Sequence, residues 1–75
     1  MSVSGVLVDI RIYVVVNATT NYRDARIYRT LAAAAAAGRV GDEIEELVAL
    51  DGAVRFQLER VWEIEPGKRL TELAF

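Results

Sequence analysis

Residues 6–16, VLVDIRIYVVV, constrain the fold more than any other stretch of this chain. Every second residue from Val6 to Val16 is apolar, and all of these residues are β-branched. A period of two places such side chains on one face of a β-strand, and β-branched residues favour strands. The opposite face is mixed, because it carries Asp9 and Arg11 as well as apolar residues. The sequence therefore predicts a long strand with one continuous apolar face.

The hydrophobic period changes after this strand, within NATTNYRD. Asn21 is a favoured N-cap residue, and Asp24 follows it by three positions, as in a capping box. At about 100° per residue, one sector of a helix collects four apolar residues: Ile27, Tyr28, Leu31 and Ala35. Six consecutive alanines, residues 32–37, favour helix, and Gly38 is a natural end. The pattern predicts a helix over residues 22–37 whose thin alanines let it lie close to a sheet.

The remaining half of the chain is typical of a meander of antiparallel strands. Asp51-Gly52 is the two-residue signal of a type I′ hairpin turn, which favours strand for residues 44–50. A short helix starting after Asp42 is the alternative for the same segment.

The next strand alternates from Val54 to Ile64, with a break in phase at Arg60 and Val61. This break indicates a β-bulge or a point that faces a partner. Residues 65–68, EPGK, fit a type II turn, and residues 70–75 form the last predicted strand.

Together these elements predict one compact α+β domain over residues 1–75. A single helix covers one face of a four-stranded, mainly antiparallel sheet, in the chain order strand, helix, strand, strand, strand. The first strand is expected beside an edge of the meander. Four aromatic residues are expected in the core or at its rim: Tyr28, Phe56, Trp62 and Phe75.

Composition argues against catalysis and against a metal or cofactor. The 75 residues include no cysteine and no histidine, so the chain lacks a thiolate nucleophile and the usual near-neutral base. Four clustered acidic residues could ligate a hard cation: Asp42, Glu43, Glu45 and Glu46. They lack the loop spacing and the turn glycine of a calcium site. We therefore expect a protein that is not an enzyme and holds no metal or cofactor.

The apolar segments are too short for a membrane span, which needs ~20 residues. The N-terminus has no basic region of the kind that begins a signal peptide. We expect a cytoplasmic protein with no membrane partner.

Arginines on the outward side of the predicted helix are the main candidate binding residues. Three of them follow one another at a spacing of three: Arg23, Arg26 and Arg29. Three further residues could join them: Tyr22, Arg39 and Arg11. Such a group could contact phosphates or an acidic protein surface, and a merely solvated helix face is the alternative. The net charge of −2 argues against strong nonspecific DNA binding.

The sheet face that one helix cannot cover is the second candidate surface. The residues predicted to point there are apolar: Leu7, Tyr13, Val15, Leu47, Ala49 and Val61. Four of them are the candidate interface residues: Leu7, Tyr13, Val15 and Val61. An exposed apolar strip would indicate a protein partner or a homodimer. Alternatively, the sheet curls and its last strand folds over this face.

In size and layout the chain resembles the compact α+β inhibitors encoded by phages and mobile elements, including some anti-CRISPR proteins. The resemblance is carried by the strand VLVDIRIYVVV, the helix NYRDARIYRTLAAAAAAG and the meander VALDGAVRFQLERVWEIEPGKRL. It implies a protein that blocks a nucleoprotein effector. We therefore expect a non-enzymatic protein-binding module. A weak nucleic-acid binder using the arginines and a homo-oligomeric assembly subunit are the alternatives.

Overall fold

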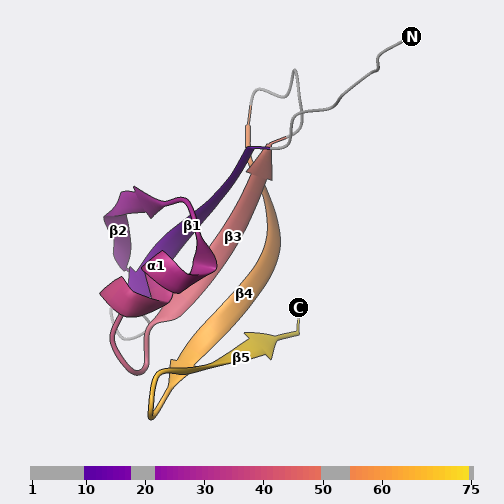
Figure 1. The fold of residues 1–75 in the computed structure, drawn as a ribbon. Coiled ribbons are helices and arrows are strands. Elements are labelled where there is room, and N and C mark those ends of the chain that lie inside the picture. The colour runs from indigo at the N-terminus through magenta and orange to yellow at the C-terminus, as the bar shows by residue number, and fades with distance from the viewer. Residues whose placement is uncertain (1–9, 18–21, 50–54, 75) are drawn as a thin grey trace, which may run out of the picture.

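The fold is one five-stranded antiparallel sheet with a short helix on one face (Figure 1). The computed structural model describes residues 10–17, 22–49 and 55–74, with only the backbone for residues 22–25. The strands are β1 (Ile10–Asn17), β2 (Tyr22–Tyr28), β3 (Glu43–Ala49), β4 (Gln57–Glu65) and β5 (Arg69–Leu73). Their order in the sheet is β2-β1-β3-β4-β5, and α1 (Leu31–Ala37) lies between β2 and β3 in the chain. Within these ranges, the predicted α+β class with a single helix is confirmed, but the sheet has five strands rather than four.

The additional strand is β2, so the predicted helix over residues 22–37 is wrong in its first half. The backbone of β2 pairs antiparallel with β1, with Ile27 opposite Val14. Without β2, β1 would leave one row of backbone hydrogen-bonding groups unpaired, and this tertiary requirement outweighs local helical periodicity. The helix instead begins after its N-cap residue Thr30, whose side-chain oxygen accepts a hydrogen bond from the Ala33 amide at 3.1 Å. Only the alanine run, which has the highest helix propensity, remains helical.

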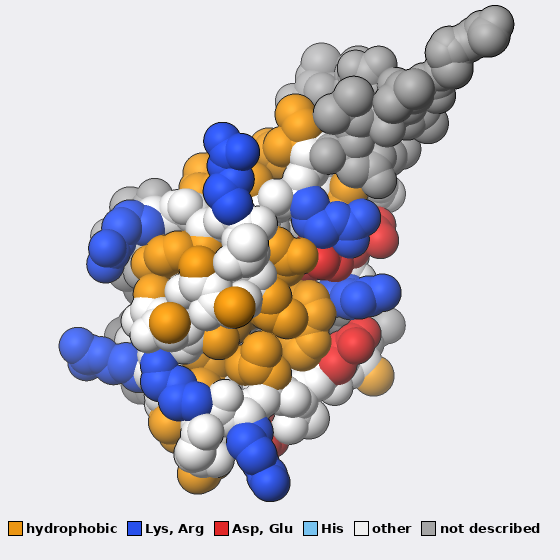
Figure 2. All heavy atoms as spheres, in the orientation of Figure 1, with side chains coloured by type: hydrophobic (Ala, Val, Ile, Leu, Met, Phe, Trp, Pro, Cys, Tyr) orange, Lys and Arg blue, Asp and Glu red, His pale blue; other side chains and the backbone are white. Residues whose placement is uncertain are grey.

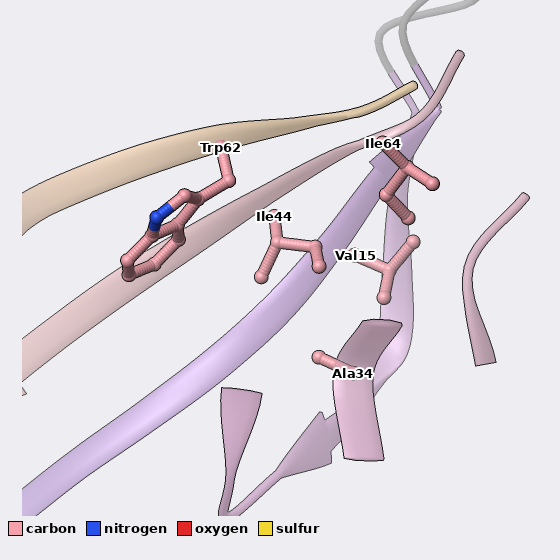
Figure 3. Close-up of a cluster of buried hydrophobic side chains, with 5 residues drawn as sticks. All are labelled: Val15, Ala34, Ile44, Trp62 and Ile64. Carbon is pink, nitrogen blue, oxygen red and sulfur yellow. The ribbon is translucent and has the colours of Figure 1, made fainter. Parts of the chain in front are cut away.

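The core lies between α1 and the sheet. Its fully packed members come from four elements (Figure 3): Val15, Ala34, Ile44, Trp62 and Ile64. Ala34 is completely buried, as expected for a small side chain that lets a helix approach a sheet closely. Gly38, which follows α1, has the same role, because a Cβ atom there would lie 2.5 Å from Ile64 Cδ1. The predicted core position of Trp62 is confirmed.

The predicted meander is confirmed where the structure describes it. Residues 43–49 are strand rather than helix, and β1 pairs with β3 at the edge of the meander. Gly67 has φ +82°, as a type II turn requires, and the Lys68 amide donates to the Glu65 carbonyl at 2.9 Å. Asp51, Gly52 and Phe75 lie outside the described residues.

A bulge in β4 decides which side chains reach the core. Glu46 is opposite Arg60, but the next pair is Leu47 and Leu58, so Glu59 is the extra residue. The bulge predicted beside Arg60 is thereby confirmed. It places Leu58 and Arg60 on opposite faces, although they are two residues apart. The prediction of Phe56 as a core residue is wrong, because Phe56 precedes this change of phase and is exposed.

Lys68 connects the β4–β5 turn to the end of α1. Its Nζ atom donates to the carbonyl oxygens of Ala35, Ala36 and Gly38, at 2.9, 3.1 and 2.6 Å. The last carbonyls of a helix have no partner within the helix, and a cation there also complements the helix dipole. The turn therefore holds a helix that is too short to be stable alone.

Candidate functional site

The register of the sheet separates two surfaces with different chemistry. Val15, Ile44 and Trp62 share the helix face, which packs against α1. The opposite side is here called the open face. Because side chains alternate along a strand, each residue of β1, β3 and β4 can be assigned to one of these faces.

Exposed apolar side chains gather on the open face. Ile12 lies opposite Leu47, and Leu47 lies opposite Leu58, so one row crosses three strands. Ile10 lies on the same side of β1, and Ile27 lies opposite Val14 at the β2 edge. The exposed fractions are 55% for Ile10, 60% for Ile27 and 42% for Leu58. We call these residues the open-face apolar surface: Ile10, Ile12, Ile27, Leu47 and Leu58.

Carboxylates border this surface on the same face. Glu45 of β3 lies in the row next to Leu47, and Glu43 lies one row further along. Glu43 is directly opposite Glu63 of β4. Like charges directly opposite one another destabilise a sheet, and these side chains are only half-buried. We call Glu43, Glu45 and Glu63 the acidic rim.

A charged cluster lies on the helix face, in the row formed by Tyr13, Glu46 and Arg60. Glu46 is only 3% exposed. Its Oε2 atom accepts a hydrogen bond from the Tyr13 hydroxyl at 2.9 Å and lies 3.3 Å from Arg11 Nη1. Its Oε1 atom has no hydrogen-bond partner among the described residues, and Arg60 Nε lies 4.0 Å from it. We call Arg11, Tyr13, Glu46 and Arg60 the Glu46 cluster.

Tyr13 is a hydrogen-bond donor in this cluster over the physiological pH range. Burial raises the pKa of its hydroxyl above 10.0, and the hydrogen bond to Glu46 and the negative charge of that carboxylate raise it further. Arg11 and Arg60 act in the opposite direction on the same pKa. The Trp62 ring packs against Tyr13 with ring centroids 6.2 Å apart. This packing fixes the side of the cluster that faces the core.

The structure does not assemble the predicted arginine face. Arg26 lies in β2 and Arg29 in the connection to α1, so a common helix no longer aligns them. The backbones of Tyr22 and Arg23 belong to β2, and their side chains lie outside the description. The helical spacing was misleading because this segment pairs with β1.

The other two predicted arginines have separate environments. Arg39 is exposed after α1, where its backbone amide donates to Asp42 Oδ2 at 3.0 Å. Arg11 belongs to the Glu46 cluster, together with Arg60. Sequence reasoning recorded Arg60 only as a break in phase and Glu46 only as part of an acidic segment. The signal that could have found Glu46 is its place between Ile44 and Val48, in the apolar phase of a strand.

The predicted apolar strip is also rearranged. Tyr13 and Val15 face α1, and Val15 is buried in the core, so neither forms an open strip. Leu47, Ala49 and Val61 lie on the open face as predicted, but Ala49 and Val61 are almost completely buried. Leu7 lies outside the described residues. Both faces of β1 are inaccessible near its end, because Val14 and Val16 are buried as well.

Residues 42–46 do not form a common ligand set. Glu46 points to the helix face, whereas Glu43 and Glu45 point to the open face. Among the described residues, no group of three or more acidic side chains is arranged to hold a metal ion. No helix in the part of the chain that the structure describes is long and apolar enough to cross a membrane.

Comparisons with family models, curated proteins and solved structures found no match to this chain.

Proposed function

We propose that this chain is a non-enzymatic protein-binding module that acts by occupying the surface of a partner with its open face. The open-face apolar surface carries the proposal. An open face of an antiparallel sheet is normally polar, yet Ile10, Ile27 and Leu58 are 42–60% exposed here. The partly buried Ile12 and Leu47 continue the apolar row from β1 through β3 to Leu58 of β4. Contiguous exposed apolar surface of this kind marks protein–protein interaction sites.

The acidic rim defines the chemistry of the partner. Glu43 and Glu63 repel one another across the β3–β4 ladder, and a cation brought near them would relieve this repulsion. A matching partner surface is apolar at its centre and has lysines or arginines at its border. Proteins that bind nucleic acids carry basic surfaces. Inhibition of a cytoplasmic nucleoprotein effector, the role implied by the resemblance to phage inhibitors, is therefore the activity we propose.

The alternatives lose or lack the geometry on which they depended. A nucleic-acid binder was predicted from aligned arginines, and Arg26 and Arg29 are now on different elements. A homo-oligomeric subunit would need the acidic rim of one copy to meet a basic region on the open face of another. Arg69, which lies opposite Glu65 on that face, is the basic residue that such a contact would have to use.

The test is affinity capture from cells of the host that encodes the chain, followed by binding measurements with the purified partner. We compare the native chain with Leu58→Asp, and use Val40→Asp as the matched control. Val40 is comparably exposed but follows α1 instead of lying on the sheet. Native chain and Val40→Asp should bind the same basic protein equally, and Leu58→Asp should bind at least tenfold more weakly.

Equal binding by Leu58→Asp would contradict the proposal, provided that its thermal unfolding matches that of the native chain. Sedimentation of the native chain alone gives a second decisive outcome. A dimer that Leu58→Asp dissociates would assign the open face to a second copy and would overturn the proposed partner.

A further inference from the structure

The open-face apolar surface is a band that crosses the strands. Ile12, Leu47 and Leu58 lie side by side on β1, β3 and β4. Ile27 continues the band onto β2, one row away from Ile12 on the same face. The band thus crosses four neighbouring strands, and three strand spacings of ~4.8 Å give it a length of about 14 Å.

The band is narrow in the direction of the strands. On the side of the acidic rim, the next row of β1 and β4 holds Val14 and Val61, which are almost completely buried. On the other side, Ile10 adds one exposed apolar residue. Rows on the same face are ~7 Å apart, so the exposed apolar area of the described strands is about as wide as one α-helix, which measures ~10–12 Å with its side chains.

A helix can occupy such a band without losing backbone hydrogen bonds. The band lies on a sheet face, where the strands are already paired with one another. An extended segment lying there would bury N–H and C=O groups without partners, whereas a helix pairs these groups internally. The ~5.4 Å pitch of a helix also brings one residue per turn near each successive strand. The same sheet already packs a helix on its other face, where Ala34 of α1 meets Val15 and Ile44.

The acidic rim indicates the charge of the helix that would lie there. Along β3, Glu43 is four residues from Leu47, about 14 Å, and it lies opposite Glu63 of β4. The flank of a helix centred over Leu47 therefore ends about 8 Å from these carboxylates. This distance is within the ~10 Å over which charges act at 0.1 M salt. Basic residues on that flank are consequently attracted to Glu43 and Glu63.

The α1 side of the molecule is bordered by basic side chains. Arg29 and Arg39, at the two ends of α1, are both exposed. Figure 2 shows Lys and Arg side chains around the hydrophobic centre of this side, with acidic side chains near one margin. A basic helix is therefore directed to the open face.

We propose that the open face binds an amphipathic helix of the partner, which lies across the strands. Its apolar stripe covers the band, and its lysines or arginines lie on the flank next to Glu43 and Glu63. At 1.5 Å per residue, about ten residues of helix span the band. Because it names the element that occupies the open face, this assignment rests on the proposed function.

The probes are synthetic peptides of about 14 residues, which is enough to span the band. In the first, leucines recur at helical spacing and lysines lie on one flank of the leucine stripe. The second has the same composition, but its leucines alternate with the other residues, as in a strand. The third carries glutamates in place of the lysines of the first. Each peptide is titrated at constant ionic strength, with methyl NMR signals of the chain reporting the site and circular dichroism reporting peptide helicity.

We expect the first peptide to become helical on binding and to shift the methyl signals of Ile12, Leu47 and Leu58 in a saturable way. It should bind at least tenfold more tightly than the alternating peptide and the glutamate peptide. The difference from the alternating peptide measures the need for a helix, and the difference from the glutamate peptide measures the need for a basic flank.

Two pairs of variants locate the site. Leu58→Ser removes an apolar side chain without adding a charge and should weaken binding of the first peptide at least tenfold, whereas the matched control Val40→Ser should leave it unchanged. Glu63→Lys should weaken binding as well. Glu72→Lys is its matched control, because Glu72 lies opposite Trp62 and therefore on the helix face, and it should have a smaller effect.

No saturable binding of the first peptide, equal binding of the alternating or the glutamate peptide, or shifts confined to another surface would overturn the helical occupant. Affinity capture with Leu58→Asp separates this result from failure of the proposed function. If capture of a basic partner still depends on Leu58, the proposed function stands and only the helical occupant is wrong. If capture does not depend on Leu58, both are wrong.

Discussion

Glu46 is the residue that depends most on its neighbours. A carboxylate that is removed from water costs several kcal/mol unless charges and hydrogen bonds compensate it. Here the compensation comes from Tyr13 and two arginines on the strands at either side. All four residues meet only because β1 and β4 both pair with β3 in the observed register. The cluster is therefore sensitive to any change in that register.

The pKa of Tyr13 reports on this arrangement. Because it is raised in the folded chain, the unfolded chain loses the Tyr13 proton first, at a pH near 10.0. The contribution to stability is therefore complete below pH 10 and falls as pH rises through the folded pKa. Glu46→Gln removes the carboxylate charge and should lower the Tyr13 pKa. Ultraviolet titration of phenolate checks this, with Tyr13→Phe identifying the signal. An unchanged Tyr13 pKa in Glu46→Gln would show that the carboxylate does not act on the hydroxyl.

At the scale of elements, local pattern predicted those strands that are closed by recognisable turns. β3, the turn before β5 and the bulge near Arg60 all followed from turn residues and phase. β2 was not predicted, because its strand conformation depends on pairing with the edge of β1. The hydrophobic periodicity of residues 22–28 does not record that pairing. The Glu46 cluster was missed for a related reason. A bulge changes the sheet face on which the side chains of β4 lie, and the sequence pattern does not indicate which of the two faces the helix will cover.

The close approach of Gly38, which follows α1, to Ile64 of β4 gives the sharpest test at this scale. Gly38→Ala would place a methyl group 2.5 Å from Ile64 Cδ1, inside a fully buried site. We expect a loss of about 1–3 kcal/mol in the free energy of unfolding, the usual range for an overpacked core. Ile64→Val removes Cδ1, so the double variant should lose less stability than the two single variants together. Urea unfolding of the four chains measures this coupling. Additive losses would mean that Gly38 and Ile64 do not compete for the same space.

At the scale of the whole molecule, we propose that one sheet face provides stability and the other provides recognition. The helix face holds the core and keeps its buried charge compensated by partners. The open face combines exposed apolar side chains with carboxylates that repel one another. Surfaces that bind partners commonly retain features that reduce the stability of the free protein. Stability and binding should therefore respond in opposite directions to a change in the acidic rim.

Glu63→Lys tests this opposition directly. It converts the Glu43–Glu63 pair into an attractive one and should raise the free energy of unfolding by about 0.2–1 kcal/mol. Salt should stabilise the native chain relative to the variant, because it screens repulsion in one and attraction in the other. Glu65→Lys is the matched control: Glu65 already lies opposite Arg69, so this change should destabilise the chain. Urea unfolding at low and high salt measures both effects. Glu63→Lys should also weaken binding to a basic partner. If the variant gained no stability and its unfolding showed the same salt dependence as that of the native chain, Glu43 and Glu63 would not repel one another measurably.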